Sequence, residues 1–233
     1  MAVINDPTTG ANIARVGMAS GMTWVPMHTV PGPLPVGNGG AFRLSMTSGT
    51  IAASLAANSE LFQFRYVTGA SRVAMVFGIT VSAAMIVVPT AGTTTVNMQL
   101  RATAARSWTV AGSGGTRATL TGNNQKLRTG HATSEVNDIG MATTGALTAG
   151  TKTLDTQDIG GITGGVYFDL AASDYTAQLI PQTNLLGEFA GGMGFPLVLA
   201  NQEGFVVRTG LVMPATMTWN LVVNVLWSEV DGF

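Results

Sequence analysis

From residue 42 onward, apolar residues recur at every second position over short runs, and this spacing constrains the fold more than any other feature. Residues 42–46 alternate Phe, Leu and Met with Arg and Ser, and residues 61–67 place three aromatic side chains on one face. Successive side chains of a strand point to opposite sides, so a period of two indicates half-buried strands. Further strands are predicted at residues 73–81, 83–88, 95–102, 106–110, 162–170 and 177–180.

The clearest runs lie near the C-terminus, at residues 196–200, 204–213 and 218–228. The run 204–213 is largely apolar on both faces, which is expected of a strand inside a sandwich with a further segment docked outside it. In the last run, odd positions from Trp219 to Trp227 form an unbroken apolar stripe. We predict that the last two runs form a β-hairpin.

The middle of the chain, residues 111–165, is rich in Gly, Thr, Ser and Asn and predicts short strands with long connections. Residues 50–59 are the helix candidate, because they are rich in Ala and follow Ser48, a possible N-cap. Many strands separated by turn signals, with almost no helix, predict an all-β protein. The expected architecture is a jelly-roll-like β-sandwich.

Residues 1–40 differ from the rest because prolines and glycines dominate their second half. Alternate prolines remove backbone donors and impose an extended chain. We therefore expect an extended N-terminal arm over residues 1–40 and a β-sandwich domain over residues 41–233. The arm is too apolar for a solvated linker, so either it lies along a neighbouring surface or it packs on its own domain. The residues expected to make an interface are Trp24, Val25, Met27, Val30, Pro31, Pro33 and Leu34.

Only 10% of the residues are charged, the formal net charge is −1 and the mean hydropathy is +0.33. An ordinary soluble domain has about 25% charged residues, and charge keeps free proteins apart. The apolar run 73–88 is short for a membrane-spanning helix and rich in β-branched residues. The composition therefore indicates a component of an assembly, and no membrane contact is expected.

The chain has few residues suited to catalysis, because it contains no cysteine and its two histidines are His28 and His131. Ser134 and Glu135 follow His131 too closely to define a catalytic triad by sequence alone. Four carboxylates at positions 155, 158, 169 and 174 do not follow the spacing of a calcium loop and are interpreted as turn residues. We expect no enzyme activity, no metal and no cofactor.

One cluster of basic residues comprises Arg101, Arg106, Arg117, Lys126 and Arg128. The near-zero net charge argues against phosphate neutralisation, so nucleic acid is not an expected partner. A solvated face or ion pairs between subunits are the interpretations favoured here.

Three aromatic residues, Trp108, Tyr167 and Tyr175, could serve as stacking platforms for a sugar. Packing in the core is the simpler use of such side chains. A glycan-binding adhesin therefore stands as the alternative from a different functional class.

Three segments carry a resemblance to a known family: residues 120–130, residues 146–155 and, above all, PLVLANQEGFVVR at residues 196–208, with WSEV following at residues 227–230. Over its C-terminal half the chain resembles virion proteins of tailed bacteriophages and metagenomic phage genomes. The resemblance implies a structural virion component and transfers no catalytic residue.

The expected role is a capsid-associated decoration or cement protein, with a tail-tube, neck or tail-tip protein as the alternative in the same class. The expected partners are other copies of the chain, with a trimer suited to a symmetry axis, and other virion proteins such as the major capsid protein. The N-terminus lacks the pattern of a signal peptide, so the expected location is the virion, assembled in the host bacterial cytoplasm.

Overall fold

The computed structural model describes residues 2–5, 12–16, 40–68, 72–87, 94–122, 125–168, 178–187, 196–215 and 217–231, and every regular element in these ranges is a β-strand. The chain divides into two compact units, Met1–Pro35 and Val36–Phe233. In the first unit, β1 (Ala2–Asn5) pairs with β2 (Asn12–Val16) in an antiparallel ribbon. This ribbon was not predicted from the sequence.

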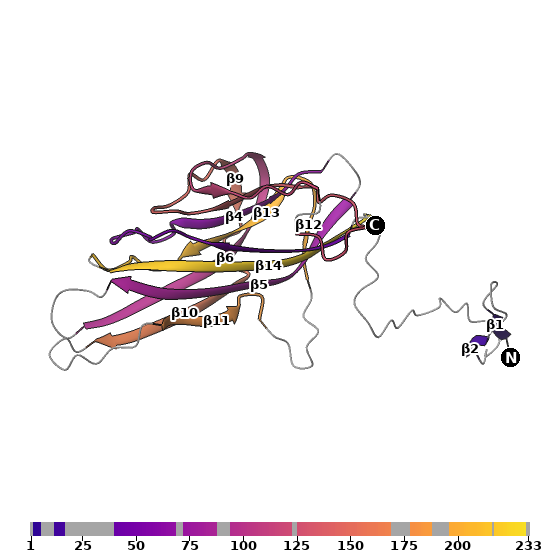
Figure 1. The fold of residues 1–233 in the computed structure, drawn as a ribbon, viewed down its shortest axis with the longest axis horizontal. Coiled ribbons are helices and arrows are strands. Elements are labelled where there is room, and N and C mark those ends of the chain that lie inside the picture. Colours follow the sequence, from indigo (N-terminus) through magenta and orange to yellow (C-terminus); the bar gives the residue numbers. More distant parts are fainter. Residues whose placement is uncertain are drawn as a thin grey trace. The chain divides into compact units, whose positions relative to one another are not determined.

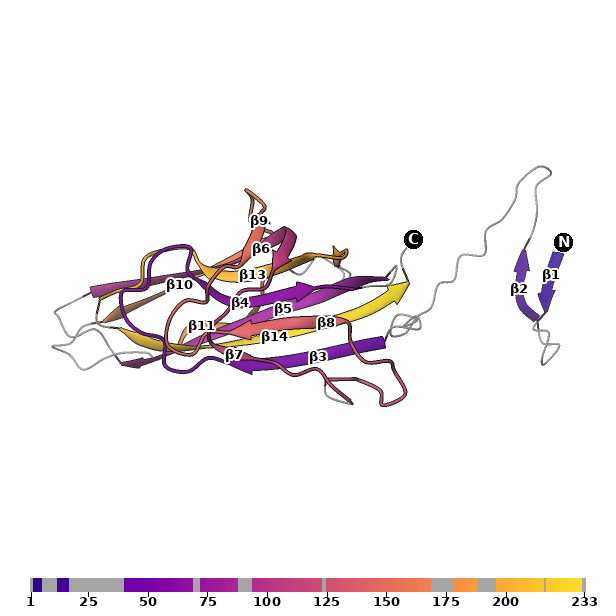
Figure 2. The ribbon, with the colours of Figure 1, turned by 90° about the horizontal axis from the view of Figure 1, so that it is seen from above.

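The second unit contains two antiparallel sheets (Figures 1 and 2). Sheet I has the order β10-β6-β13-β4-β8-β7, with β9 beside β6, and sheet II has the order β11-β5-β14-β3, with β12 beside β5. The strands are β3 (Gly40–Thr47), β4 (Glu60–Tyr66), β5 (Arg72–Val87), β6 (Thr94–Val110), β7 (Thr116–Arg117), β8 (Val136–Met141), β9 (Thr151–Leu154), β10 (Gly160–Phe168), β11 (Gln178–Asn184), β12 (Leu197–Leu199), β13 (Glu203–Thr209) and β14 (Thr218–Asp231).

The pairing of the principal strands is nested. The first, β3, pairs with the last, β14; β4 pairs with β13, β5 with β11, and β6 with β10. Two further pairings, β13 with β6 and β14 with β5, join these ladders into the two sheets. A long antiparallel hairpin rolled over in this way is a jelly roll. The strand order thus confirms the predicted jelly-roll-like β-sandwich.

The core lies between the sheets and contains the large side chains that the alternating pattern placed on one face. Trp219, Leu221, Val223, Val225 and Trp227 of β14 are all buried, which confirms the predicted stripe. The ring of Trp227 stacks on Phe42 at 5.4 Å and meets the edge of Phe64 at 5.2 Å, and Phe64 stacks on Phe205 at 5.0 Å. Aromatic contacts therefore join both sheets through Trp227.

The predicted hairpin between the last two runs is wrong. β13 belongs to sheet I, between β6 and β4, whereas β14 belongs to sheet II, between β5 and β3. The connection from residue 210 to residue 217 crosses between the sheets instead of turning within one. Alternation predicts which face of a strand is buried, but it does not identify the neighbouring strand.

The helix candidate at residues 50–59 is also wrong. Ile51 is buried and forms a β-bridge with Trp219, and Ser54 and Asn58 have φ angles of 59° and 63°. The amide of Ile51 donates to the Trp219 carbonyl and that of Asn58 donates to the Thr209 carbonyl. Because these donors bond to distant segments, the backbone cannot form helical hydrogen bonds.

Two pairs of predicted strands are single long strands in the structure. Residues 73–81 and 83–87 belong to β5, residue 88 lies outside the described residues, and residues 95–102 and 106–110 belong to β6. In β5, the polar Ser82 lies on the outer face and does not interrupt the ladder to β14. Within the described residues, no helix is long and apolar enough to cross a membrane.

Candidate interaction surface

Part of the outer face of sheet I is covered by the chain itself. Trp108, at the far end of β6, is buried against Ala105 and Val206, with Leu154 of β9 packed beside them. A side chain at Gly204 would come within 2.9 Å of the Trp108 ring, so glycine allows the indole to lie directly on β13. This confirms the segment expected outside β13, and it places Trp108 in a core instead of at a sugar-stacking surface.

A polar network lies beneath the same covering segment. The Lys152 ammonium lies 2.8 Å from a carboxylate oxygen of Glu60, and the two side chains are only 2% and 8% exposed. Burial lowers the pKa of Lys152, although the hydrogen bond and charge of Glu60 act in the opposite direction. The Gln63 amide donates to Glu60 at 2.7 Å and to the Thr148 carbonyl at 2.8 Å. No sequence pattern indicated this network, because its members come from two segments about 85 to 92 residues apart.

The basic cluster predicted as a solvated face or a set of contacts between subunits is divided among intramolecular ion pairs. Arg101 pairs with Asp158 at 3.3 Å, Arg106 with Glu203 at 2.8 Å, and Arg117 with Asp138 at 2.8 Å. These intramolecular pairs take the place of the predicted pairs between subunits, while the three side chains remain 31–39% exposed to solvent. Lys126 and Arg128 form no ion pair within the part of the chain that the structure describes.

The carboxylates considered for calcium also have hydrogen-bond or ion-pair partners within the chain, where the structure describes them. Asp158 accepts hydrogen bonds from Thr103 at 2.6 Å and from Arg208 at 3.0 Å. Burial opposes the charged form of Asp158, but these bonds and the charges of Arg208 and Arg101 hold its pKa below the usual value. Asp155 lies 3.4 Å from Arg106, and Asp169 and Asp174 fall outside the described residues. Among those residues, no group of three potential metal ligands occurs.

The residues considered for a catalytic triad have separate structural partners. The His131 ring accepts a hydrogen bond from the Ala41 amide at 3.2 Å, whereas Ser134 donates to the buried Glu229 at 2.5 Å. Glu135 pairs with Arg72 at 2.9 Å. Together these contacts attach the loop before β8 to sheet II at one end of the sandwich.

Burial and the nearby charges of Glu229 and Glu135 raise the pKa of Tyr66, so this phenol stays neutral.

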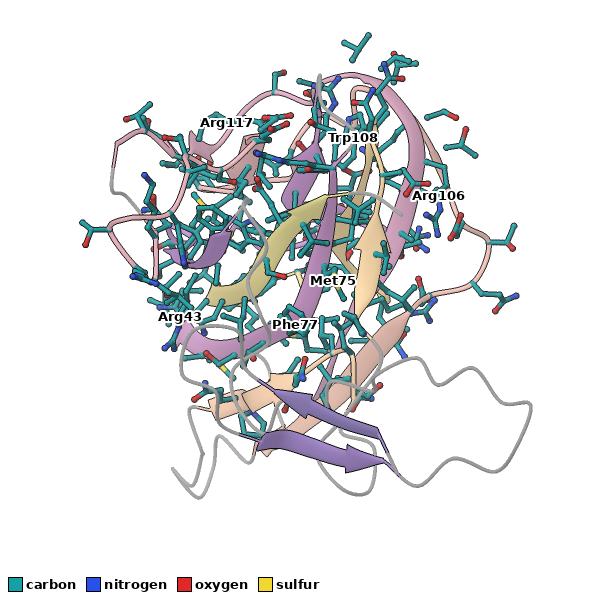
Figure 3. The ribbon with its side chains drawn as sticks, turned by 90° about the vertical axis from the view of Figure 1, so that its right-hand side faces the viewer. Arg43, Met75, Phe77, Arg106, Trp108 and Arg117 are labelled. Atoms are coloured by element: carbon teal, nitrogen blue, oxygen red, sulfur yellow. The ribbon has the colours of Figure 1, made fainter. Side chains whose placement is uncertain are left out.

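The outer face of sheet II differs from that of sheet I. Its apolar side chains, partly or largely exposed, are Met75 and Phe77 of β5, Val222 and Leu226 of β14, and Val198 of β12. Figure 3 shows Met75, Phe77 and Arg43 on the opposite side of the sandwich from Trp108, Arg106 and Arg117. Among the side chains that the structure describes in this sheet, the one acidic group is that of Glu229, and it is buried. These apolar side chains lie among polar ones, including Arg43, Thr80 and Asn224, and no described segment covers the face.

A hollow of about 360 Å³ opens on this face. Its apolar lining includes Phe77, Leu226 and Leu127, and its polar side chains include Arg43, Gln182 and Asn224. Leu127 reaches it because residues 125–127 extend sheet II beyond β3: the Leu127 amide donates to the Ala41 carbonyl at 2.9 Å. The hollow thus combines an aromatic ring and aliphatic side chains with hydrogen-bond donors.

The predicted interface residues of the arm, from Trp24 to Leu34, lie outside the described residues, as do His28 and Tyr175. The side chain of Tyr167, in β10, is also outside the description. The interface therefore remains a prediction.

No protein-family model and no curated protein sequence matches this chain. Among solved structures, the chain is similar to VP1 of Trichodysplasia spinulosa-associated polyomavirus, recorded in complex with 6'-sialyllactose, with 12% sequence identity. The match covers 86% of this chain and 96% of that one, with a TM-score of 0.29. A superposition of this quality supports no argument about function, so the assignment of the jelly roll rests on the strand order.

Proposed function

We propose that this chain is a structural component of a bacteriophage virion, a capsid-associated decoration or cement protein that binds the shell. The observation that carries the proposal is the outer face of sheet II, which exposes apolar side chains, shows no acidic side chain among those described, and is uncovered by any described segment. Jelly rolls are a recurrent architecture of viral capsid proteins and lectins. The resemblance of the C-terminal half to phage virion proteins supports the same role.

The physical basis of such a role is burial of apolar surface. Each Å² of apolar surface removed from water contributes about 25 cal/mol, so burial of the apolar side chains on this face favours contact with a neighbour. Many weak contacts repeated on one particle become strong through multivalency. In this proposal the N-terminal arm supplies the second contact, copies of the chain associate around a symmetry axis, and the major capsid protein is the other partner.

Two alternatives have different observable consequences. A tail-tube, neck or tail-tip protein would use the same apolar face in a ring or stack of subunits. An adhesin would need an exposed ring for sugars, and Trp108, the one candidate whose side chain the structure describes, is buried. The structural role is therefore favoured over the adhesin.

Cryo-electron microscopy of particles that carry this chain tests the proposal. Density for the sandwich on an icosahedral shell, with the face of sheet II against a neighbour, is the expected result. A ring or stacked tube would instead identify the chain as a tail protein. If the chain is absent from purified particles by mass spectrometry, the virion proposal fails.

A further inference from the structure

The hollow on sheet II presents hydrogen-bond donors without nearby acids. The guanidinium of Arg43 forms no ion pair within the described residues, and Gln182 and Asn224 contribute side-chain amides. Every acidic side chain that the structure describes is bonded elsewhere, and none points into the hollow. A complementary ligand would carry many hydrogen-bond acceptors and some apolar groups, and it would need no net charge.

The chain itself contains a segment with this chemistry. Residues 24–35, WVPMHTVPGPLP, include prolines at positions 26, 31, 33 and 35 and no charged residue. Proline lacks an N–H group, and the spacing of the prolines predicts a polyproline-like backbone, which makes no internal hydrogen bonds and would offer its carbonyl oxygens as acceptors. Proline-rich segments bind to grooves lined by aromatic side chains because their extended form loses little entropy. Phe77 supplies the aromatic wall.

We propose that residues 24–35 of one copy bind in the hollow of sheet II of a neighbouring copy. Arg43 and the amides donate to the arm's carbonyls, while Phe77, Leu127 and Leu226 receive its prolines and apolar side chains. The inference rests on the proposed assembly of copies in a virion and names the surface that receives the arm. An arm of one copy on the face of the next is a head-to-tail contact, which generates a ring when the rotation closes.

The length of the arm permits this contact. A fully extended chain spans at most about 3.3–3.6 Å per residue, so residues 24–39 can reach at most about 55 Å. That distance is comparable with the diameter of a domain of this size. Two identical faces of sheet II placed against each other would instead oppose their Arg43 side chains and leave the donors unsatisfied.

Photocrosslinking of the full chain tests the inference. One form carries p-benzoylphenylalanine at position 27, and it is mixed with an isotopically heavy form that lacks the probe. We expect crosslinks from residue 27 to heavy peptides of β5 or β14. Leu226→Asp in the heavy form should reduce their yield about tenfold, which corresponds to about 1.4 kcal/mol.

Leu211→Asp is the matched control, because Leu211 and Leu226 are both leucines with 40% exposure and Leu211 lies outside the hollow. Its yield should equal that of the unmodified chain. Arg43→Gln provides a second variant at an exposed site and should also reduce the yield, in case Leu226→Asp lowers the melting temperature. Crosslinks confined to light peptides, crosslinks to another surface, or yields unaffected by both hollow variants would each overturn the inference.

The outcome is separable from that of the proposed function. Mass spectrometry of purified particles reports whether the chain is a virion component, whatever the arm contacts. If the chain is found in particles and the heavy crosslinks are missing, the arm inference fails and the virion role stands. If the crosslinks form and the chain is absent from particles, the virion role fails and the arm contact stands.

Discussion

The ammonium group of Lys152 lies 2.8 Å from a carboxylate oxygen of Glu60 and 4.3 Å from the centre of the Trp108 ring. These contacts join β9 to the start of β4 and to the end of β6. The segment that covers sheet I is therefore held by a buried charge pair as well as by apolar packing. Sheet II has no such cover among the described residues, which is why its face is the candidate for binding partners.

Replacing Lys152 by Met should lower the free energy of unfolding by about 3–5 kcal/mol, because Glu60 would be left buried with an uncompensated charge. Urea denaturation measures the change. The matched control is Lys126→Met, since Lys126 is the other lysine and forms no ion pair in the described structure; it should change stability by less than about 0.5 kcal/mol. Equal effects of the two substitutions would contradict the buried pair.

Asp158 should contribute to acid denaturation. Its pKa in the folded state lies below the ordinary value of 3.8, so the unfolded chain binds its proton first as the pH falls. The stabilisation from Asp158 is therefore complete above pH 3.8 and is lost as the pH falls through the folded-state pKa. Chemical denaturation of wild type and Asp158→Asn at several pH values measures it. The difference should be constant above about pH 5 and shrink below pH 3.8. A difference independent of pH would show that Asp158 does not titrate as expected.

Trp227→Ala should lower the free energy of unfolding by about 3–5 kcal/mol, because the fully buried indole fills the contact between the sheets. Its N–H group also donates to Glu229 at 3.3 Å. Trp227→Phe should cost less, since it keeps an aromatic ring and removes only part of the volume and that donor. A loss below about 1 kcal/mol for the alanine variant would contradict the packing described here.

Removal of residues 1–35, the first compact unit, should leave a folded sandwich and weaken assembly. The reason is that β3 begins at Gly40 and all its pairing partners lie later in the chain. Circular dichroism and thermal melting report the fold, and sedimentation velocity reports association. A truncated chain without cooperative melting would show that the arm is part of the folding unit.

The sequence predicted features that depend on neighbouring residues, but it did not predict those that depend on contacts between distant segments. The stripe from Trp219 to Trp227 identified a buried strand face because alternation is a local property. The partner of that strand, β3, and the ion pairs of Arg101 and Arg117 depend on register between distant segments, which no local pattern encodes. Residues 50–59 were mistaken for a helix because alanine content reflects local propensity, whereas Ile51 is held by Trp219.

The nested pairing of the strands determines when each sheet can form during synthesis. Phe42 and Trp227 stack across the pairing of β3 with β14, yet translation at about 5–20 residues per second separates their synthesis by roughly 10–40 s. Sheet II therefore cannot close until β14, which pairs with both β3 and β5, has left the ribosome. Leu226 lies on that strand, so the proposed binding face is incomplete until β14 has been made. A chain interrupted before β14 would lack this face, which would restrict assembly to subunits whose sandwich is complete.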